Sequence, residues 1–206
     1  MPTRPSILTR RRILKAASRV FAEQGYEGAS IRDIVARADV NQATINYHFG
    51  SKEGLYRAVL ELALAALTNA DTAAGNGETR EAELRAFVGR QLRPLLGKDE
   101  LSDYLRIFNW ETVRPSPAFR KFVAQEAGPY LASATALVRR FLPPRATPKQ
   151  AMLAALWLVG QCSIFVRNRE QLARRPLGFE VDQRFVEELT GMVADWAAAG
   201  LAASKR

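Results

Sequence analysis

Cysteine and histidine are nearly missing from the 206-residue chain, which has a single copy of each, Cys162 and His48. One cysteine excludes a framework of internal disulfides. Zinc sites and catalytic triads need clusters of histidine, cysteine and carboxylate side chains, so these two residues support neither. The sequence also lacks a Gly-rich phosphate loop, a nucleophile elbow and a paired-carboxylate pattern. We therefore expect a protein that is not an enzyme and that uses no metal and no cofactor.

Long apolar runs are also scarce. No run reaches the ~20 apolar residues that cross a bilayer, and the best candidate, 151–166, contains Gln161 and Ser163. The first residues are rich in arginine and lack the apolar segment of a secretory signal. These features predict a cytoplasmic protein with no membrane partner. Because 48% of the residues are apolar, the chain is expected to fold around a packed core.

Acidic residues are few at the start of the chain, where none precedes Glu23. The whole chain has a formal net charge of +9, and residues 1–60 hold ten basic and five acidic side chains, a net of +5. A strongly basic balance indicates a polyanionic partner. Since the positive charge is densest in residues 1–60, we expect the polyanion to bind there.

Two short helices joined by a tight turn are predicted within residues 30–52. Ser30 followed by Asp33 is typical of a helix N-terminus. Apolar residues then recur on one helical face, at Ile31, Ile34, Val35 and Ala38. The segment 39–41, Asp-Val-Asn, breaks this period with residues that favour turns, and Asn41 can cap a second helix over 42–49. This arrangement is a helix-turn-helix, whose second helix enters the major groove of DNA.

The second helix has a polar face, because its apolar residues are only Ile45 and Phe49. The polar face consists of Gln42, Ala43, Thr44, Asn46 and Tyr47. Amide side chains pair with adenine, and small side chains approach the methyl group of thymine. The face therefore predicts contact with base edges. An ordinary pair of amphipathic helices in a bundle is the alternative at this point.

Residues 39–49 and 51–53, DVNQATINYHF and SKE, resemble the DNA-binding signature of TetR-family transcriptional regulators. The resemblance covers about residues 10–60 and includes FAEQGY at 21–26. It implies a sequence-specific DNA-binding regulator, by default a repressor, that a small-molecule effector releases from its operator. A DNA-binding architectural or protein-recruiting factor without an effector is the alternative. The family usually has glycine, then serine or threonine, and then an aromatic residue where this chain has Asp39, Asn41 and Asn46.

The resemblance also assigns roles to single residues. It implies that Tyr47, His48 and Lys52 contact phosphates. Base edges are expected to be approached by Arg32, Gln42, Ala43, Thr44 and Asn46. Cations near the start of the first helix are expected to contact phosphates as well, or else to form a solvated tail; they are Arg10, Arg11, Arg12 and Lys15.

The rest of the chain keeps a helical period, so the predicted fold is all-α. Residues 1–51 are expected to form a three-helix helix-turn-helix domain that starts with an arm over 1–9. Residues 52–206 are expected to form a helical bundle for effector binding and dimerisation. The expected helices are 10–24, 31–38, 42–49, 52–74, 78–96, 101–112, 118–142 with a bend at Gly128-Pro129, 149–170 and 182–199.

The last two predicted helices are apolar around much of their circumference, which is typical of buried helices. The resemblance implies that they form a four-helix interface in a homodimer. A two-fold dimer places two recognition helices one DNA turn apart, ~34–36 Å, on a palindromic or pseudo-palindromic operator. The alternative is that both helices belong to the core of one chain. Residues 154–162 and the arginine-rich loop after them resemble the effector-binding C-terminal domain of the CecR-type (YbiH-like) subgroup.

An effector pocket is expected among the middle helices, since pockets combine apolar walls with a few polar groups. The candidate lining residues are Tyr104, Phe108, Trp110, Phe119, Phe122, Trp157, Gln161 and Phe165. Their character predicts a small aromatic or amphipathic effector, although each could instead be a core residue. Cys162 lies in an apolar helix, where a thiol is poorly reactive, so we expect a core thiol rather than a redox sensor.

Overall fold

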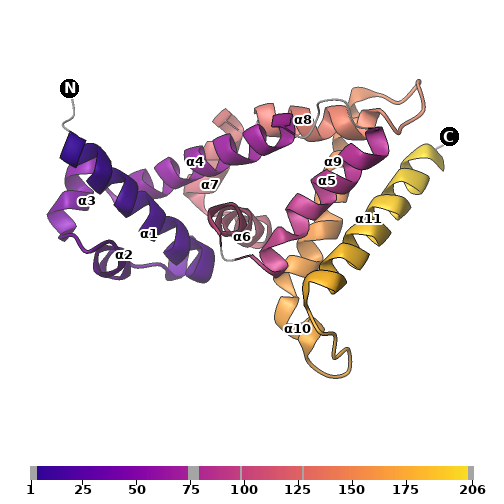
Figure 1. Ribbon diagram of the computed structural model, residues 1–206. Coiled ribbons are helices and arrows are strands. Elements are labelled where there is room, and N and C mark those ends of the chain that lie inside the picture. The colour runs from indigo at the N-terminus through magenta and orange to yellow at the C-terminus, as the bar shows by residue number, and fades with distance from the viewer. Residues whose placement is uncertain (1–3, 74–78, 98, 127, 204–206) are drawn as a thin grey trace. The chain divides into compact units, whose positions relative to one another are not determined.

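The computed structural model describes residues 4–73, 79–97, 99–126 and 128–203. Over these residues every regular element is a helix and there is no strand (Figure 1), which confirms the predicted all-α class. The elements are α1 Arg4–Gly28, α2 Ile31–Ala38, α3 Gln42–Phe49, α4 Lys52–Ala73, α5 Arg80–Leu92, the 3-10 helix η1 Arg93–Leu95, α6 Glu100–Val113, α7 Pro117–Glu126, α8 Gly128–Arg139, α9 Pro148–Arg167, α10 Arg169–Ala173 and α11 Gln183–Ala203.

Several helix ends differ from the predicted ones. Residues 4–9 continue α1 instead of forming an arm, and residues 1–3 lie outside the described residues, as do the predicted ends at 74 and 78. The predicted helix 118–142 is divided into α7 and α8, since a proline at 129 cannot donate a helical hydrogen bond but suits a first turn. The predicted helix 149–170 ends at Arg167, where the Asn168 side chain donates to the Ile164 carbonyl oxygen at 2.7 Å.

The described residues form two compact units, one from 1–66 and 98–127, the other from 67–97 and 128–206. Each unit has its own apolar core. Helices α6 and α7 thus pack with α1 to α3 and the first part of α4, although α5 precedes them in sequence. The expected end of the DNA-binding domain at residue 51 stays a prediction.

The core of the first unit is built from completely buried aliphatic and aromatic side chains. Those with no exposed surface include Ile13, Val20, Phe21, Ile34, Ile45 and Leu55. The Phe21 and Tyr56 rings meet edge to face, with centroids 4.6 Å apart. Burying each such side chain contributes about 1.5–3 kcal/mol, so this core fixes α2 and α3 on α1 and α4.

Gly25 marks a kink in α1, with φ 69° and ψ 177°, a conformation that only glycine adopts readily. The Trp110 ring of α6 lies against this glycine, and its Nε1 donates to the Ala22 carbonyl oxygen at 3.0 Å. The helix predicted over 10–24 thus ends at the non-helical Gly25, as expected, and a further helical segment of α1 follows to Gly28. The bend brings Tyr26 to the start of α4, where its ring centroid is 4.8 Å from that of Tyr56.

Helix α6 contributes polar side chains to the interior of the first unit. Glu111 is 2% exposed and accepts hydrogen bonds from the Tyr56 hydroxyl at 2.6 Å, the Ser116 hydroxyl at 2.9 Å and the Ser116 backbone N–H at 2.6 Å. Burial and the bond to Glu111 raise the pKa of Tyr56, so the phenol stays a donor. Ser116 in turn accepts from the Phe119 N–H at 3.1 Å. One buried carboxylate thus joins α4, α6 and the beginning of α7.

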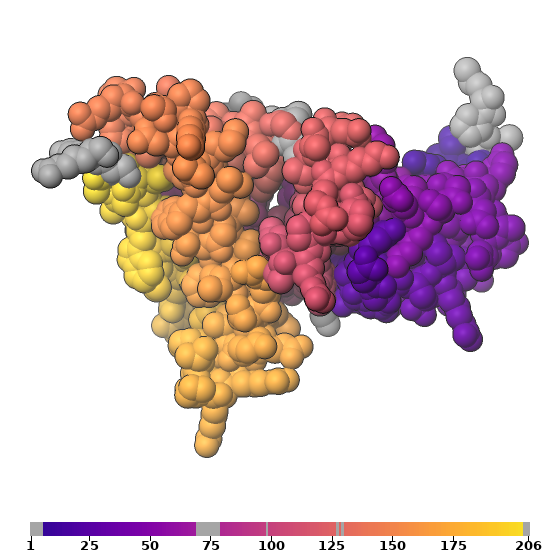
Figure 2. Space-filling model, turned by 180° about the vertical axis from the view of Figure 1, so that it is seen from behind, coloured from indigo at the N-terminus to yellow at the C-terminus, as the bar shows by residue number. Residues whose placement is uncertain are grey.

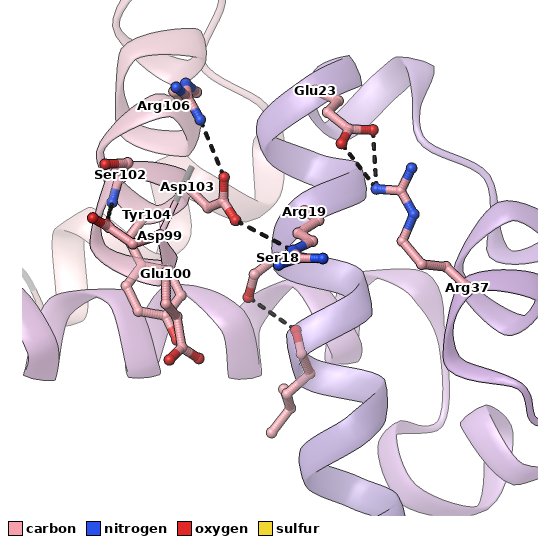
Figure 3. A network of polar contacts seen from close by, with 11 residues as sticks. Ser18, Arg19, Glu23, Arg37, Asp99, Glu100, Ser102, Asp103, Tyr104 and Arg106 are labelled. Atoms are coloured by element: carbon pink, nitrogen blue, oxygen red, sulfur yellow. Dashed lines mark hydrogen bonds and ion pairs between the residues drawn. The ribbon is translucent and has the colours of Figure 1, made fainter. Parts of the chain in front are cut away.

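A second polar contact joins α6 to α1 (Figure 3). Asp103 lies between Arg106, at 3.2 Å, and Arg19, at 4.0 Å. Burial raises the pKa of Asp103, and the two arginines oppose this shift. Tyr104 is buried beside it and donates to Glu100 at 2.9 Å.

The second unit is a bundle of α5, α8, α9 and α11, with α10 packed beside α9. Its central helix is α5, which buries Leu84, Phe87, Val88 and Leu92. Helix α9 starts with a reciprocal cap between Thr147 and Gln150. Cys162 is 1% exposed in this core, and burial raises the pKa of its thiol to about 12, as expected for a core thiol.

Candidate nucleic-acid interface

The predicted helix-turn-helix is present, and local capping explains where its helices begin. The Ser30 hydroxyl accepts from the Asp33 N–H at 3.0 Å, and the Asn41 side-chain oxygen accepts from the Thr44 N–H at 2.9 Å. Between the two helices, Asp39 takes a left-handed conformation with φ 50°. Ile45, with no exposed surface, anchors α3 on the core of the first unit.

The opposite face of α3 is open to solvent. Tyr47 is 83% exposed, and Gln42, Ala43 and Asn46 are also exposed. Thr44 is half-buried, and its hydroxyl is engaged with the Asn41 side chain at 2.8 Å. The methyl group of Thr44, rather than its hydroxyl, is therefore available for contact with a DNA base. Arg32, in the first turn of α2, is exposed.

Two cations near α3 are held over aromatic rings. The Arg10 guanidinium lies 5.3 Å from the centroid of the Phe49 ring, at the end of α3. The Lys52 ammonium lies 4.6 Å from the centroid of the Tyr26 ring. Such contacts hold a cation on an aromatic face with its outer side still accessible. The half-buried His48 packs between the neighbouring rings of Tyr47 and Phe49, with centroids 5.1 and 6.0 Å away.

The other cations at the start of α1 that are predicted to contact phosphates differ in their surroundings. Arg11 and Lys15 are exposed, whereas Arg12 donates to carbonyl oxygens in the turn after α2. A hollow of about 230 Å³ on the first unit is lined by Arg12, Lys15, Ala16, Arg19, Arg37 and Ala38. Arg37 at this hollow is bonded to Glu23 at 2.9 Å, which raises its pKa (Figure 3). Sequence reasoning missed the Arg10 and Arg12 contacts, because their partners are 26 or more residues away and leave no local pattern.

The eight candidate pocket residues are divided between the two units, with five in the first unit and three in the second. Tyr104 and Phe122 are buried in the first unit, and the Phe108 and Phe119 rings meet at 5.6 Å. Trp110 is half exposed but bonded to Ala22. In the second unit Trp157 and Gln161 are exposed on α9 and Phe165 is half-buried. Most of the candidate residues in the first unit pack against other residues of that unit. The effector pocket stays a prediction.

The second unit exposes an apolar surface on α9 and α11. On α9 it consists of Met152, Leu153, Leu156, Trp157 and Ile164. On α11 it includes Met192 and Trp196, which is 66% exposed. The space-filling view shows α9 in orange with no other helix of the second unit over it (Figure 2). These are the last two long helices, and each is buried on one face only within the chain.

Helix α9, Pro148–Arg167, is also long and apolar enough to cross a membrane. This helix is longer than the apolar run 151–166 that the sequence shows. Length and composition are weak evidence, because core and interface helices of soluble proteins have the same properties. The other face of α9 packs Ala155, Leu158 and Cys162 into the core of the second unit, which indicates a packing helix.

Two family descriptions match the chain. Residues 13–59 match the bacterial regulatory proteins of the tetR family, and residues 80–204 match the C-terminal domain of the HTH-type transcriptional dual regulator CecR. The families are regulators rather than enzymes. A curated relative, the HTH-type transcriptional repressor NicS of Pseudomonas putida, is 44% identical over 63 residues, 31% of this chain. The chain thus spans 30% of the length of NicS.

Solved structures share the fold over nearly the whole chain. The fatty acid degradation regulator FadR of Bacillus halodurans superposes with a TM-score of 0.70 at 18% identity, covering 93% of this chain and 98% of FadR. AibR, solved with isovaleryl coenzyme A and operator DNA, gives a TM-score of 0.66 at 20% identity, covering 89% of this chain and 97% of AibR. At these identities the likeness shows the fold alone.

The second family match covers more than half of the chain, and the first contains a helix-turn-helix with an open polar face. The chain therefore belongs to the TetR family of bacterial transcriptional regulators, in the group that has a CecR-type C-terminal domain.

Proposed function

We propose that this protein is a sequence-specific DNA-binding regulator that acts in the cytoplasm as a repressor. The observation that carries this proposal is the face of α3 on which Gln42, Ala43, Asn46 and Tyr47 are exposed while Ile45 anchors the helix from behind. An amide-rich face with small side chains can approach base edges in the major groove. Repression is the simplest effect, because a bound protein blocks polymerase without a further contact surface. NicS, the relative named above, is a repressor.

The phosphate contacts that accompany base reading are assigned to cations and polar groups around α3. Tyr47, His48 and Lys52 are proposed to bind the DNA backbone, together with Arg10, which is held over Phe49 at the same end of α3. Arg32, at the start of α2, is proposed to approach base edges together with Gln42, Ala43, Thr44 and Asn46. Phosphate contacts set the orientation of the protein on the duplex, and base contacts select the sequence.

We further propose a homodimer through α9 and α11. In one chain their outer faces expose two tryptophans, Trp157 and Trp196, and several aliphatic side chains. Exposed apolar side chains in such number are typical of a protein interface, and aromatic residues are enriched in such interfaces. A two-fold dimer would present two copies of α3 to a palindromic or pseudo-palindromic operator, at a spacing of about one DNA turn.

Release from the operator is proposed to follow binding of a small aromatic or amphipathic effector. AibR, which has the same fold, was solved with isovaleryl coenzyme A and operator DNA. An effector lowers DNA affinity only if it binds the DNA-bound and free conformations differently. A panel of acyl coenzyme A thioesters and aromatic acids, titrated into the protein–DNA complex, tests this. If none of them changes the DNA affinity, the effector-independent alternative is favoured.

The function itself is tested by selecting bound fragments from random duplex DNA with the full-length protein. A sequence-specific regulator enriches one motif, and a two-fold dimer enriches a motif with inverted repeats. If the bound pool stays as diverse as the input, specific recognition is excluded.

A further inference from the structure

Arg12 has contacts that set it apart from the other cations at the start of α1. Its Nη2 donates to the carbonyl oxygen of Ala38 at 2.6 Å and to that of Asp39 at 2.8 Å. The same nitrogen lies 3.6 Å from the Asp39 carboxylate. The side chain therefore reaches from α1 to the turn that connects α2 with α3.

This turn has a backbone that needs support. Asp39 is the only non-glycine residue with positive φ among the described residues, with φ 50° and ψ 57°. Residues that have a Cβ atom are disfavoured there, aspartate and asparagine less than the others. The Val40 N–H bonds to the Val35 carbonyl oxygen at 3.2 Å, which closes the end of α2 in the way that a glycine usually allows. The carbonyl groups of Ala38 and Asp39 lie beyond that closure, and Arg12 is their donor.

The charge of Arg12 is also well placed for this role. The C-terminal end of a helix has unsatisfied carbonyl groups and a partial negative charge. A guanidinium at the end of α2 is favourable for both reasons. Arg11 and Lys15, on the same helix, are exposed, and among the described residues neither donates a hydrogen bond to the turn as Arg12 does.

We propose that Arg12 is a positioning residue that holds the Ala38–Asp39 turn and thereby sets the direction in which α3 leaves it. This inference rests on the proposed reading of DNA by α3. Because α3 begins at Gln42, three residues after Asp39, a change in the turn re-aims Gln42 and Asn46. Hydrogen bonds to base edges depend on distance and angle, so re-aiming reduces discrimination between sequences.

The test compares Arg12→Ala with Arg11→Ala, which removes the same charge from the neighbouring position. Affinity is measured by fluorescence anisotropy for the selected duplex and for a scrambled duplex, each at several salt concentrations. A phosphate contact contributes about 0.9 to the slope of log affinity against log salt and little to specificity. For Arg12→Ala we expect an unchanged slope and a specificity ratio that falls about tenfold, the equivalent of roughly one base contact. For Arg11→Ala the ratio should be unchanged.

A second-site variant makes the test independent of the stability of Arg12→Ala. Glycine accepts positive φ without strain, so Asp39→Gly removes the need for support at the turn. In the Asp39→Gly background, Arg12→Ala should lose less specificity than in the native background, and circular dichroism confirms that each variant is helical. Native-like specificity in Arg12→Ala, or a slope that falls by about one, overturns the positioning role. Failure of the native protein to prefer the selected duplex would instead refute the proposed function.

Discussion

The Lys52 ammonium lies over the ring of Tyr26, with Nζ 4.6 Å from the ring centroid and 3.5 Å from the Glu27 carbonyl oxygen. Tyr26 and Glu27 follow the kink at Gly25, whereas Lys52 begins α4. The kink in α1 thus supplies the surface that holds this cation near the end of α3. A lysine held in this way loses little side-chain freedom when it binds a phosphate.

Replacing Lys52 by alanine is expected to weaken binding to every duplex to a similar extent. The slope of log affinity against log salt should fall by about one for each bound protomer, because each protomer loses one neutralised phosphate. Anisotropy titrations at several salt concentrations measure both effects. Lys149→Ala, at the start of α9 in the second unit, serves as the control for loss of a positive charge. An unchanged slope in Lys52→Ala would show that Lys52 does not bind a phosphate.

Gln42 and Thr44 are expected to contribute to sequence preference in different ways. Gln42 is exposed in the first turn of α3, and Gln42→Ala should cost about 1–3 kcal/mol of discrimination at one base pair in each half-site. The Thr44 hydroxyl is bonded to Asn41, so Thr44→Val, which keeps a methyl group, should keep more discrimination than Thr44→Ala. Repeating the duplex selection with each variant measures these changes. Identical motifs for the native protein and Gln42→Ala would exclude Gln42 from base reading.

Charge placed on the apolar surface of α9 and α11 is expected to separate the proposed dimer. Leu156→Glu and Trp196→Glu each bring a carboxylate into a surface that would be dry in the dimer, where an unpaired charge is costly. Sedimentation equilibrium should show a dimer for the native protein and a shift to monomer for both variants. Val113→Glu changes an exposed valine of the first unit and should leave the dimer intact. A native protein that is monomeric at micromolar concentration would contradict the proposed interface.

Asp103 predicts a pH dependence of stability. Burial raises its pKa in the folded state, so the folded state binds the proton more tightly than the unfolded state. The resulting stabilisation is complete below the unfolded pKa of about 3.9 and is lost as pH rises through the folded pKa. Asp103→Asn lacks this effect, so the native stability should fall relative to that of the variant from about pH 4 to pH 7. Urea unfolding at both pH values measures the difference, with the exposed Asp195→Asn as control; a difference that grows in favour of the native protein would refute it.

The helix-turn-helix was predictable because its signals are local. Ser30 and Asn41 cap helices that begin one residue later, and the exposed face of α3 follows from its period. The contacts that complete the candidate site are different, since Arg10 packs on Phe49 and Arg12 bonds to Ala38. These pairs are brought together only when α1 packs on α2 and α3, so no sequence window contains them.

The placement of α6 and α7 also escaped prediction. Their helical period was clear, but the period does not say which core a helix joins. Glu111 and Trp110 decide it, through contacts with Tyr56 on α4 and Ala22 on α1. The aromatic character of residues on α6 and α7 predicts pocket walls, but in the structure Phe122 lies in the core of the first unit, with Phe108 and Phe119 packed against it.

The central claim is that two symmetry-related copies of α3 read duplex DNA, and half-site spacing tests it most directly. The affinity of the native protein should be measured for the selected duplex and for the same duplex with about five base pairs inserted at its centre, which rotates one half-site by roughly half a turn. Two linked recognition helices cannot both reach their half-sites on the longer duplex, so the affinity should fall at least a hundredfold, to about the value for scrambled DNA. Equal affinity for the two duplexes would contradict paired recognition by α3.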